Sequence, residues 1–396
     1  MNYDIIIIGA GLVGLATAYQ TKLKNPDSKI LILEKEKDVA LHQSGHNSGV
    51  IHSGIYYKPG SLKAKNCIEG YNSVINFAEQ HGIRYDLCGK IIVATSQEEL
   101  PLLDNIYKRG IENGLQDLKY LSREEFREIE PHCEGVRAIK VPQTGIIDYP
   151  GIAKKIKELF EELGGEVRFN NEVKNIINKG SEIIVITNNS EFKTRKLISC
   201  AGLYSDKITK MTNEKNDMVI IPFRGEYYKI KDEKKHLVKH LIYPVPDPSF
   251  PFLGVHFTRM IDGNIEAGPN AVLAFKKEGY NFFDFNFSET MQTMLWPGFR
   301  KIVAKYGKTG MGEMHRSLSK SAFTKALQKL LPEIQENDLV PGGSGVRAQA
   351  CDRNGGLIDD FDIVKNGNII HVRNAPSPAA TSCLSIGNKI SELITN

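Results

Sequence analysis

The N-terminal segment holds a glycine-rich turn between a buried strand and a helix, and it constrains the fold more than any other feature. Residues 3–8 are continuously apolar and rich in β-branched side chains, which is typical of a central parallel strand buried on both faces. The turn GAGLVG follows at 9–14, and residues 12–24 have helical spacing. A second strand is predicted at 29–33 and ends at Glu34. This order predicts a dinucleotide-binding βαβ unit.

Each glycine of the turn has its own expected role in holding a nucleotide. Gly9 makes the tight turn, Gly11 lets the backbone approach a pyrophosphate, and Gly14 lets the helix pack closely on the strand. The helix N-terminus supplies free N–H groups and partial positive charge for the phosphates. We expect Glu34 to accept hydrogen bonds from the hydroxyls of the adenosine ribose.

Two features favour FAD over NAD as the bound dinucleotide. After Glu34 the chain enters a long loop rich in Gly, Ser and His, residues 41–54, where a simple NAD domain starts its next helix. We expect this loop to wrap the part of FAD beyond the pyrophosphate. No second fingerprint is present, because the glycine-rich residues 341–345 are predicted to lie in a loop without a strand and a helix around them. The substrate itself is therefore the expected electron donor.

Composition excludes several classes of protein. With 41% hydrophobic and 25% charged residues, the 396-residue chain is typical of a soluble globular protein of two or three domains. A net charge of +4 is too small to mark a nucleic-acid binder. The six cysteines have no metal-ligand spacing, so we expect reduced thiols and no metal. The apolar run at 5–16 is too short to span a bilayer.

The remaining sequence predicts an α/β fold in which a Rossmann-type FAD-binding domain is interrupted by an α+β substrate domain with a mixed sheet. Helical periodicity is strongest at 61–79, 98–113 and 151–163, and 379–395 is predicted to close the chain as a helix. Strands are predicted at 166–177, 181–187 and 191–199, and between 218 and about 287, where 252–258 is one example. We assign residues 1–89, 145–215 and 336–396 to the FAD-binding domain, and residues 90–144 and 216–335 to the substrate-binding domain.

Long motifs are spread over the whole chain. The longest is SGHNSGVIHSGIYY at 44–57, and the others lie at 59–64, 200–206, 222–225, 243–246, 250–258, 268–275, 345–349 and 371–381. Together they resemble the L-2-hydroxyglutarate dehydrogenase and oxidase family, which belongs to the FAD-dependent, D-amino-acid-oxidase-like group. The resemblance implies oxidation of L-2-hydroxyglutarate to 2-oxoglutarate, with the electrons passing to a quinone or to oxygen.

The resemblance also bears on location, and it leaves alternatives open. The chain lacks the N-terminal targeting extension of mitochondrial members, so we expect a bacterial-type, cytoplasmic protein. Peripheral contact with the cytoplasmic face of the inner membrane stays open. One alternative is another small donor on the same scaffold, such as a D-amino acid, glycine or glycerol 3-phosphate. The other is a flavoprotein acting on tRNA, against which the weak net charge argues.

Oxidation of a secondary alcohol removes a hydride from carbon and a proton from oxygen. The flavin takes the hydride, and a base of near-neutral pKa takes the proton, for which histidine is the usual residue. We predict His52 as this base, because it lies in the loop that is expected to run along the flavin. His256 and His371 are the alternatives, and a histidine that only hydrogen-bonds the loop is the competing interpretation.

The substrate is a five-carbon dicarboxylate, so both of its anionic ends need partners. An arginine suits a carboxylate because its planar fork donates two hydrogen bonds. Arg347 resembles the carboxylate-binding arginine of the wider oxidase group. Arg224 is predicted either to bind the second carboxylate or to brace the flavin domain, and His256, Tyr243 and Tyr57 are candidate polar walls.

The last predicted site is the start of the C-terminal helix, which follows PSPAAT at 376–381. Its free N–H groups are expected to form an anion hole for the negative charge that the flavin gains on reduction. The full set of predicted cofactor-binding residues is Gly9, Gly11, Gly14, Glu34, Ser44, Asn47, Ser48, Gly49, Val173, Ala201, Gly202, Pro378, Ala379, Ala380 and Thr381.

Overall fold

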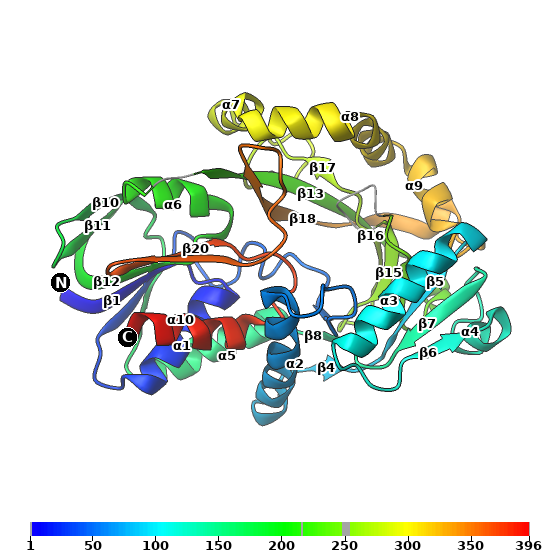
Figure 1. Cartoon of the computed structure of the whole chain (residues 1–396), viewed down its shortest axis with the longest axis horizontal. Helices are drawn as coiled ribbons and strands as arrows, with labels where there is room; N and C mark the ends of the chain where they lie inside the picture. Colours follow the sequence, from blue (N-terminus) through cyan, green and yellow to red (C-terminus); the bar gives the residue numbers. More distant parts are fainter. Residues whose placement is uncertain (1, 215–216, 248–253, 396) are drawn as a thin grey trace.

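Two large sheets organise the chain, and a small three-stranded sheet lies where they meet (Figure 1). The computed structural model describes residues 2–214, 217–247 and 254–395. The small sheet has the order β3 (Val50–Ile51), β8 (Gly145–Ile147) and β4 (Tyr85–Asp86). Both predicted parts of the fold are present, so the predicted α/β class with an added mixed sheet is confirmed.

The first sheet is built around the N-terminal strand β1 (Asn2–Ile8), which pairs in parallel with β12 (Glu191–Ser199) and β2 (Ile30–Leu33). Its order is β10-β11-β12-β1-β2-β9, and β20 pairs with β12 and with β19. The other bounds are β9 (Glu166–Arg168), β10 (Val173–Asn178), β11 (Ile183–Thr187), β19 (Asp362–Asn366) and β20 (Ile369–Asn374).

Side chains of β1 alternate between two buried layers, as a central strand requires. Ile5 and Ile7 pack under the helices α1 (Leu12–Lys24), α5 (Tyr149–Glu162) and α10 (Cys383–Thr395), which lie together on one face of the sheet (Figure 1). Ile6 and Ile8 pack on the opposite face, against the β10–β11 hairpin and α6 (Ser205–Met211).

The second sheet has the order β17-β13-β16-β15-β14-β5-β7-β6, and β18 pairs with β13. Its longest ladder joins β13 (Met218–Ile230) to β18 (Leu339–Asp352) in antiparallel register. The other strands are β5 (Lys90–Ala94), β6 (Lys119–Leu121), β7 (Arg137–Val141), β14 (Leu241–Pro244), β15 (His256–Arg259), β16 (Ile265–Gly268) and β17 (Val272–Leu273).

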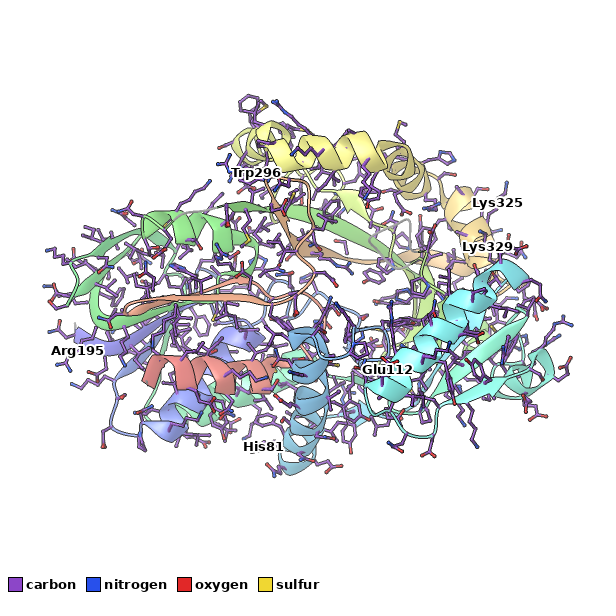
Figure 2. All side chains as sticks on the ribbon, in the orientation of Figure 1. His81, Glu112, Arg195, Trp296, Lys325 and Lys329 are labelled. Atoms are coloured by element: carbon purple, nitrogen blue, oxygen red, sulfur yellow. The ribbon has the colours of Figure 1, made fainter. Side chains whose placement is uncertain are left out.

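Helices cover both faces and the outer edge of the second sheet. The helix α3 (Leu100–Glu112) packs on the face that carries Ile92 and Ala94, while α4 (Arg123–Ile129) and α9 (Lys320–Leu327) pack on the face that carries Ile91 and Val93. At the outer edge lie α7 (Phe287–Leu295) and α8 (Pro297–Leu318), and α2 (Leu62–Gln80) lies beside α10 (Figure 1). Trp296 ties α7 and α8 to β18, because its indole Nε1 donates to the carbonyls of Cys351 and Asp352 at 3.1 and 3.0 Å (Figure 2).

The structure differs from the sequence prediction at several places. Residues 341–345 belong to β18 and not to a loop; a Cβ on Gly345 would lie 2.6 Å from the His46 carbonyl, so glycine permits this strand to run close to the loop. β18 pairs with the second sheet, whereas β19 and β20 of the same predicted segment 336–396 belong to the first sheet. The predicted strand 166–177 is two strands in different parts of the first sheet, and α7 and α8 were not predicted.

Two further differences concern boundaries. The C-terminal helix begins at Cys383, after a turn that occupies most of 376–382, and not at 379. The predicted strand 252–258 and the motif at 250–258 both begin in residues that lie outside the described part of the chain. The observed strand, β15, begins at His256. Among the described residues, no helix combines the length and the apolar character needed to cross a bilayer.

Candidate active site

One cavity of about 920 Å³ extends from the glycine fingerprint to the second sheet. Its wall includes the fingerprint and the end of β2 on one side, and β13, β15 and β18 on the other. The loop 42–48 and the turn 375–380 complete it. A cavity of this size, at the carboxyl end of a parallel sheet, is where α/β proteins bind nucleotides and small substrates.

The fingerprint has the local geometry that a bound dinucleotide needs. Gly9 has φ +102°, and a Cβ there would lie 2.6 Å from the Cys200 carbonyl, so only glycine fits. A Cβ on Gly14 would lie 2.0 Å from the Gly9 carbonyl, because α1 packs directly on the turn. A Cβ on Gly11 would touch only the Ser44 hydroxyl, at 3.1 Å. Gly11 thus presents bare backbone to the cavity, and these residues fit the pyrophosphate of FAD.

Two groups already occupy the hydrogen-bonding positions next to the fingerprint. The Ser44 hydroxyl accepts the N–H of Leu12 at 3.0 Å and so caps the start of α1. The Glu34 carboxylate accepts the N–H of Ala10 at 2.6 Å and that of Glu36 at 3.0 Å. Since a carboxylate has about four acceptor positions, Glu34 retains acceptor capacity toward the cavity that it lines.

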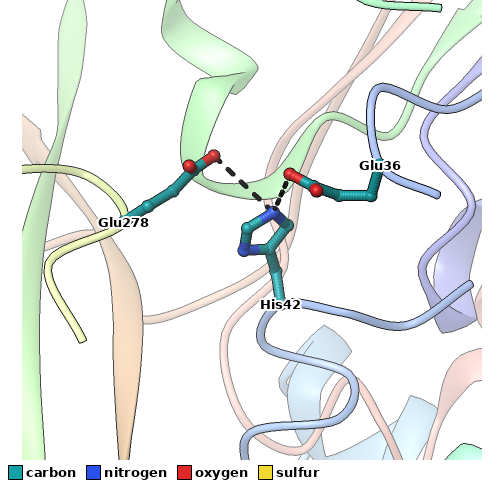
Figure 3. A group of neighbouring side chains, drawn as sticks. All are labelled: Glu36, His42 and Glu278. Carbon is teal, nitrogen blue, oxygen red and sulfur yellow. Dashed lines mark hydrogen bonds and ion pairs between the residues drawn. The ribbon is translucent and has the colours of Figure 1, made fainter. Parts of the chain in front are cut away.

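Charged side chains close the cavity at the nucleotide end. Figure 3 shows the His42 imidazole between two carboxylates, with Nε2 at 3.0 Å from Glu36 and 3.6 Å from Glu278. The Lys35 ammonium forms ion pairs with both carboxylates, and its hydrogen bond lowers the pKa of Glu36. His42 Nδ1 also lies 2.8 Å from the Tyr280 hydroxyl. This cluster joins the segment after β2 to a loop of the second sheet, beside Glu34.

The loop 41–49 owes its shape to side-chain hydrogen bonds. The Asn47 amide donates to the carbonyls of Gln43 and Ser44 at 3.0 and 2.8 Å and accepts the N–H of Gly49 at 2.8 Å. The Gln43 side chain accepts the N–H of Ala348 at 2.9 Å, which attaches the loop to β18. The loop is therefore fixed along the cavity wall.

The turn before α10 holds the segment that carries His52. The Thr381 hydroxyl accepts the His52 N–H at 3.1 Å and lies 2.8 Å from the Tyr149 hydroxyl. Thr381 is fully buried behind the cavity, so its side chain positions His52 and does not face the cofactor. Among the described residues, no acceptor takes the N–H groups of Ala380 or Thr381. Of these two donors, the one on Ala380 lines the cavity and fits the predicted anion hole.

His52 lines the cavity, and its Nε2 lies 3.3 Å from the Ser377 hydroxyl. Burial in the interior, together with the positive charges of Lys90 and Lys63, lowers the pKa of His52 to about 3. The imidazole is therefore neutral at pH 7 and carries a lone pair that can accept a proton.

His256 is the second neutral histidine of the cavity. Its Nδ1 lies 2.9 Å from the Gly254 carbonyl, which fixes the proton on Nδ1 and leaves Nε2 as an acceptor. Burial lowers the pKa of His256 to about 4, although the bond to Gly254 opposes this shift. The Tyr243 ring lies against the imidazole in a tilted arrangement, with 3.9 Å between ring centroids and 32° between the planes.

Positive charge is concentrated at the end of the cavity far from Glu34. Arg347, on β18, projects into this space, so it is exposed to the cavity although it lies deep in the molecule. Lys63 forms an ion pair with Asp359 at 2.7 Å and lies 5.1 Å from the centroid of the Tyr57 ring. Both lie near His52, since each contributes to lowering its pKa. The predicted polar wall at Tyr57 therefore stands next to a cation.

Arg224 and His371 have other partners in the structure. The Arg224 guanidinium is almost fully buried, where it pairs with Glu226 at 3.0 Å and donates to the Asn281 carbonyl at 3.1 Å. These contacts disfavour the second-carboxylate role, and the brace that they form lies within residues 216–335, the segment assigned to the substrate-binding domain. His371 is buried in β20 outside the cavity wall, with Nε2 at 2.9 Å from the Thr212 hydroxyl. It is therefore not placed to act as the base.

Comparison with known proteins agrees with this geometry. Residues 4–393 match the family described as FAD dependent oxidoreductase. The chain belongs to this family of FAD-dependent oxidoreductases. Its cofactor is accordingly FAD, as the fingerprint and the loop predicted.

Relatives of this FAD-dependent oxidoreductase share one name. A protein of Indibacter alkaliphilus named L-2-hydroxyglutarate dehydrogenase is 58% identical over 99% of this chain and 98% of its own length. The mitochondrial enzyme of that name from Homo sapiens is 47% identical, covering 99% of this chain and 88% of its own. The L-α-glycerophosphate oxidase of Mycoplasma pneumoniae, solved with FAD bound, superposes with a TM-score of 0.83 at 25% identity, over 100% of this chain and 95% of that one.

Most of the predicted site residues of this oxidoreductase meet at the one cavity. The wall contains His52, Arg347, Arg224, His256, Tyr243, Tyr57, Gly9, Gly11, Gly14, Glu34, Ser44, Asn47, Ser48, Val173, Ala201, Gly202, Pro378, Ala379 and Ala380. Gly49 and Thr381 stand behind it. Gly49 has φ +64° and closes the turn that Asn47 organises, so its role is in the loop backbone.

Sequence reasoning missed three polar residues at the substrate end. Lys63 and Lys90 are both buried, and Tyr56 lines the cavity with its hydroxyl buried. Lys90 had a detectable signal, because it heads the apolar strand KIIVA, where every residue is buried. Lys63 and Tyr56 lie within motifs but have no local feature that distinguishes them from surface residues.

Proposed function

We propose that this chain oxidises L-2-hydroxyglutarate to 2-oxoglutarate. The observation that carries the proposal is a single cavity with a dinucleotide fingerprint at one end and basic side chains around two neutral histidines at the other. Bound FAD supplies the acceptor for the hydride. A dicarboxylate of five carbons suits the basic end, and the relatives that bear this activity in their names match nearly the whole chain.

His52 takes the proton of the substrate hydroxyl. It adjoins the turn that carries the Ala380 N–H, so base and anion hole lie on the same side of the cavity. Burial is the main cause of the low pKa of His52, and the nearby cations are the second cause. A bound dianion opposes these charges and raises the pKa of His52 toward the range where a general base is effective.

Arg347 holds one substrate carboxylate. It projects into the cavity from β18, and its fork can donate two parallel hydrogen bonds. Arg224 stays with Glu226 and keeps the loop at Asn281 attached to β13.

Anaerobic mixing with a panel of donors tests the activity. L-2-hydroxyglutarate is expected to bleach the flavin absorbance and to yield 2-oxoglutarate, whereas L-lactate, glycine, a D-amino acid and glycerol 3-phosphate are not. Bleaching by glycerol 3-phosphate instead, with dihydroxyacetone phosphate as product, would overturn the proposal.

The Arg347→Ala variant should lose about 30-fold to several thousand-fold in kcat/KM, because truncating one partner of a buried charged pair costs about 2 to 5 kcal/mol. Arg347→Lys should recover only part of this loss.

We also propose that the enzyme touches an anionic membrane surface through α7 and α8 and passes its electrons to a quinone there. Eight large apolar side chains are exposed on or beside these helices: Phe283, Phe285, Phe287, Met294, Leu295, Val303, Met311 and Leu318. Arg300, Lys301 and Lys305 are exposed among them. Both acidic residues of the two helices, Glu289 and Glu313, are buried and paired with basic residues. An apolar face with basic flanks suits an anionic bilayer.

Flotation with lipid vesicles tests this contact. The protein is expected to float with vesicles rich in phosphatidylglycerol and not with phosphatidylcholine alone. Phe283→Ser with Phe287→Ser should abolish flotation, whereas Ile111→Ser, which removes a half-exposed apolar side chain from α3, should not. Equal flotation of both variants would place the contact elsewhere. Rapid reoxidation by oxygen, with no gain from a soluble quinone, would exclude the quinone.

A further inference from the structure

Lys90 is a buried basic residue for which the described residues provide no counter-ion. It is 3% exposed and heads β5 on the face that also carries Ile92 and Ala94. Its Nζ lies 4.5 Å from the centroid of the Tyr56 ring and 4.9 Å from that of Tyr243. Within the described part of the chain, no carboxylate and no hydrogen-bond acceptor reaches this ammonium group.

The surroundings of Lys90 belong to the substrate end of the cavity. Tyr56 and Tyr243 both line the cavity, with Lys90 behind them, and the Tyr243 ring lies against His256. The Tyr56 hydroxyl is buried, and none of the described residues forms a hydrogen bond with it. The titratable groups near the ammonium are Cys67, the two tyrosines and the two histidines of the cavity, and none of them is an acid at neutral pH.

An ammonium in this position is costly unless an anion completes the site. Two aromatic faces compensate only part of the lost hydration of a buried cation. Burial lowers the pKa of Lys90 to about 7, so its charge is only half retained near neutral pH. A second carboxylate in the cavity would stabilise the charged form, and Arg224, the other candidate for that carboxylate, is already paired with Glu226.

We propose that Lys90 is a positioning residue that selects dicarboxylates over monocarboxylates. Held by Tyr56 and Tyr243, its charge attracts the carboxylate that Arg347 does not grip. This inference rests on the proposed function and names the group that sets its substrate class. Lys90 does not line the cavity itself. It therefore acts on the substrate through the positions of the two tyrosines and through the electrostatic potential that its charge creates in the cavity.

Binding of two unreactive ligands tests the proposal without turnover. Glutarate and pentanoate have the same carbon chain, and only glutarate has a second carboxylate. Their dissociation constants are measured on the FAD-loaded protein by calorimetry or by the change in flavin absorbance. In Lys90→Met the constant for glutarate should rise about 10- to 100-fold, as expected for one charge lost at short range in a protein interior. The constant for pentanoate should change much less.

Control variants separate charge from shape. Lys90→Arg should retain most of the preference for glutarate, and Lys108→Met, which removes an exposed lysine from α3, should retain all of it. Lys90→Gln serves as a second neutral variant if Lys90→Met loses FAD. An unchanged preference in a neutral variant with normal FAD content would overturn the inference.

A second readout comes from the pH profile. The charge of Lys90 helps to keep the pKa of His52 low, so the acid limb of kcat/KM should move to higher pH in Lys90→Met and stay in place in Lys90→Arg. A purely structural role would not move this limb. If L-2-hydroxyglutarate proves not to be a substrate, the glutarate preference still reports on Lys90, so the two proposals fail separately.

Discussion

Thr381 offers a sharp test of how the fold positions the proposed base. In Thr381→Val the shape of the side chain is kept, but its hydroxyl is lost. The N–H of His52 then loses the one acceptor that the described residues give it, while the Tyr149 hydroxyl retains the Val50 carbonyl at 3.0 Å. An unsatisfied buried N–H costs about 1–3 kcal/mol and one lost hydrogen bond about 1 kcal/mol, so the free energy of unfolding should fall by about 2–4 kcal/mol.

The kinetic effect should exceed what a stability loss alone produces. Release of the His52 backbone shifts the imidazole, and a displacement near 1 Å of a catalytic group lowers kcat by about 10²-fold. The FAD content should stay near that of the wild type, because the Thr381 side chain lies outside the cavity wall. Single-turnover reduction, urea unfolding and the flavin-to-protein absorbance ratio measure the three quantities.

The matched control is Thr381→Ser, which retains the hydroxyl and loses one methyl group. Its kcat should stay near the wild-type value, at a cost of about 1 kcal/mol in stability. Loss of FAD in the valine variant would place this side chain in the cofactor site after all. Wild-type kcat and stability in that variant would refute the role of its hydrogen bonds.

Three further predictions concern the base, the fingerprint and the buried lysine. His52→Ala should lower kcat about 10²- to 10⁴-fold and remove the acid limb of the pH profile with FAD content intact; if His256→Ala has this effect instead, the role belongs to His256. Gly11→Val should fold, since its Cβ meets only the Ser44 hydroxyl, but it should fail to retain FAD, because the side chain fills the space of the pyrophosphate. Gly14→Val should not fold, because its Cβ would lie 2.0 Å from the Gly9 carbonyl. The soluble yield and the amount of bound flavin distinguish the two variants. Because the pKa of Lys90 is lowered to about 7, the unfolded chain binds a proton that the folded chain releases above that pH. The contribution of Lys90 to stability should therefore rise with pH between about 7 and 10, by on the order of 5 kcal/mol. The difference in unfolding free energy between the wild type and Lys90→Met, measured with urea, should grow by this amount over the same range, since both proteins share every other titrating group.

The nucleotide end of the protein was predictable because its signals are local. A strand, a turn and a helix follow each other within residues 2–24, and Gly14 is required by a contact inside that unit. Gly9 is required by its positive φ and by the Cys200 carbonyl, which follows the neighbouring strand β12. The observed bounds of β1 and α1 therefore agree closely with the prediction. The strand at 341–345 was missed because its glycines look like a loop until β13 and the loop at His46 are placed against them.

The substrate end was decided by the tertiary structure. The sequence identified His52, His256 and Arg347 as types of residue suited to the chemistry, and the motifs in which they stand indicated the family. It did not show that Lys63 and Lys90 join them, since the five residues come from separate segments that only the fold brings together. Nor did it show that Arg224 is paired or that Thr381 supports the base. Charge, pKa and hydrogen-bond partners depend on distance and burial, and both are set by packing between segments that are remote in the chain.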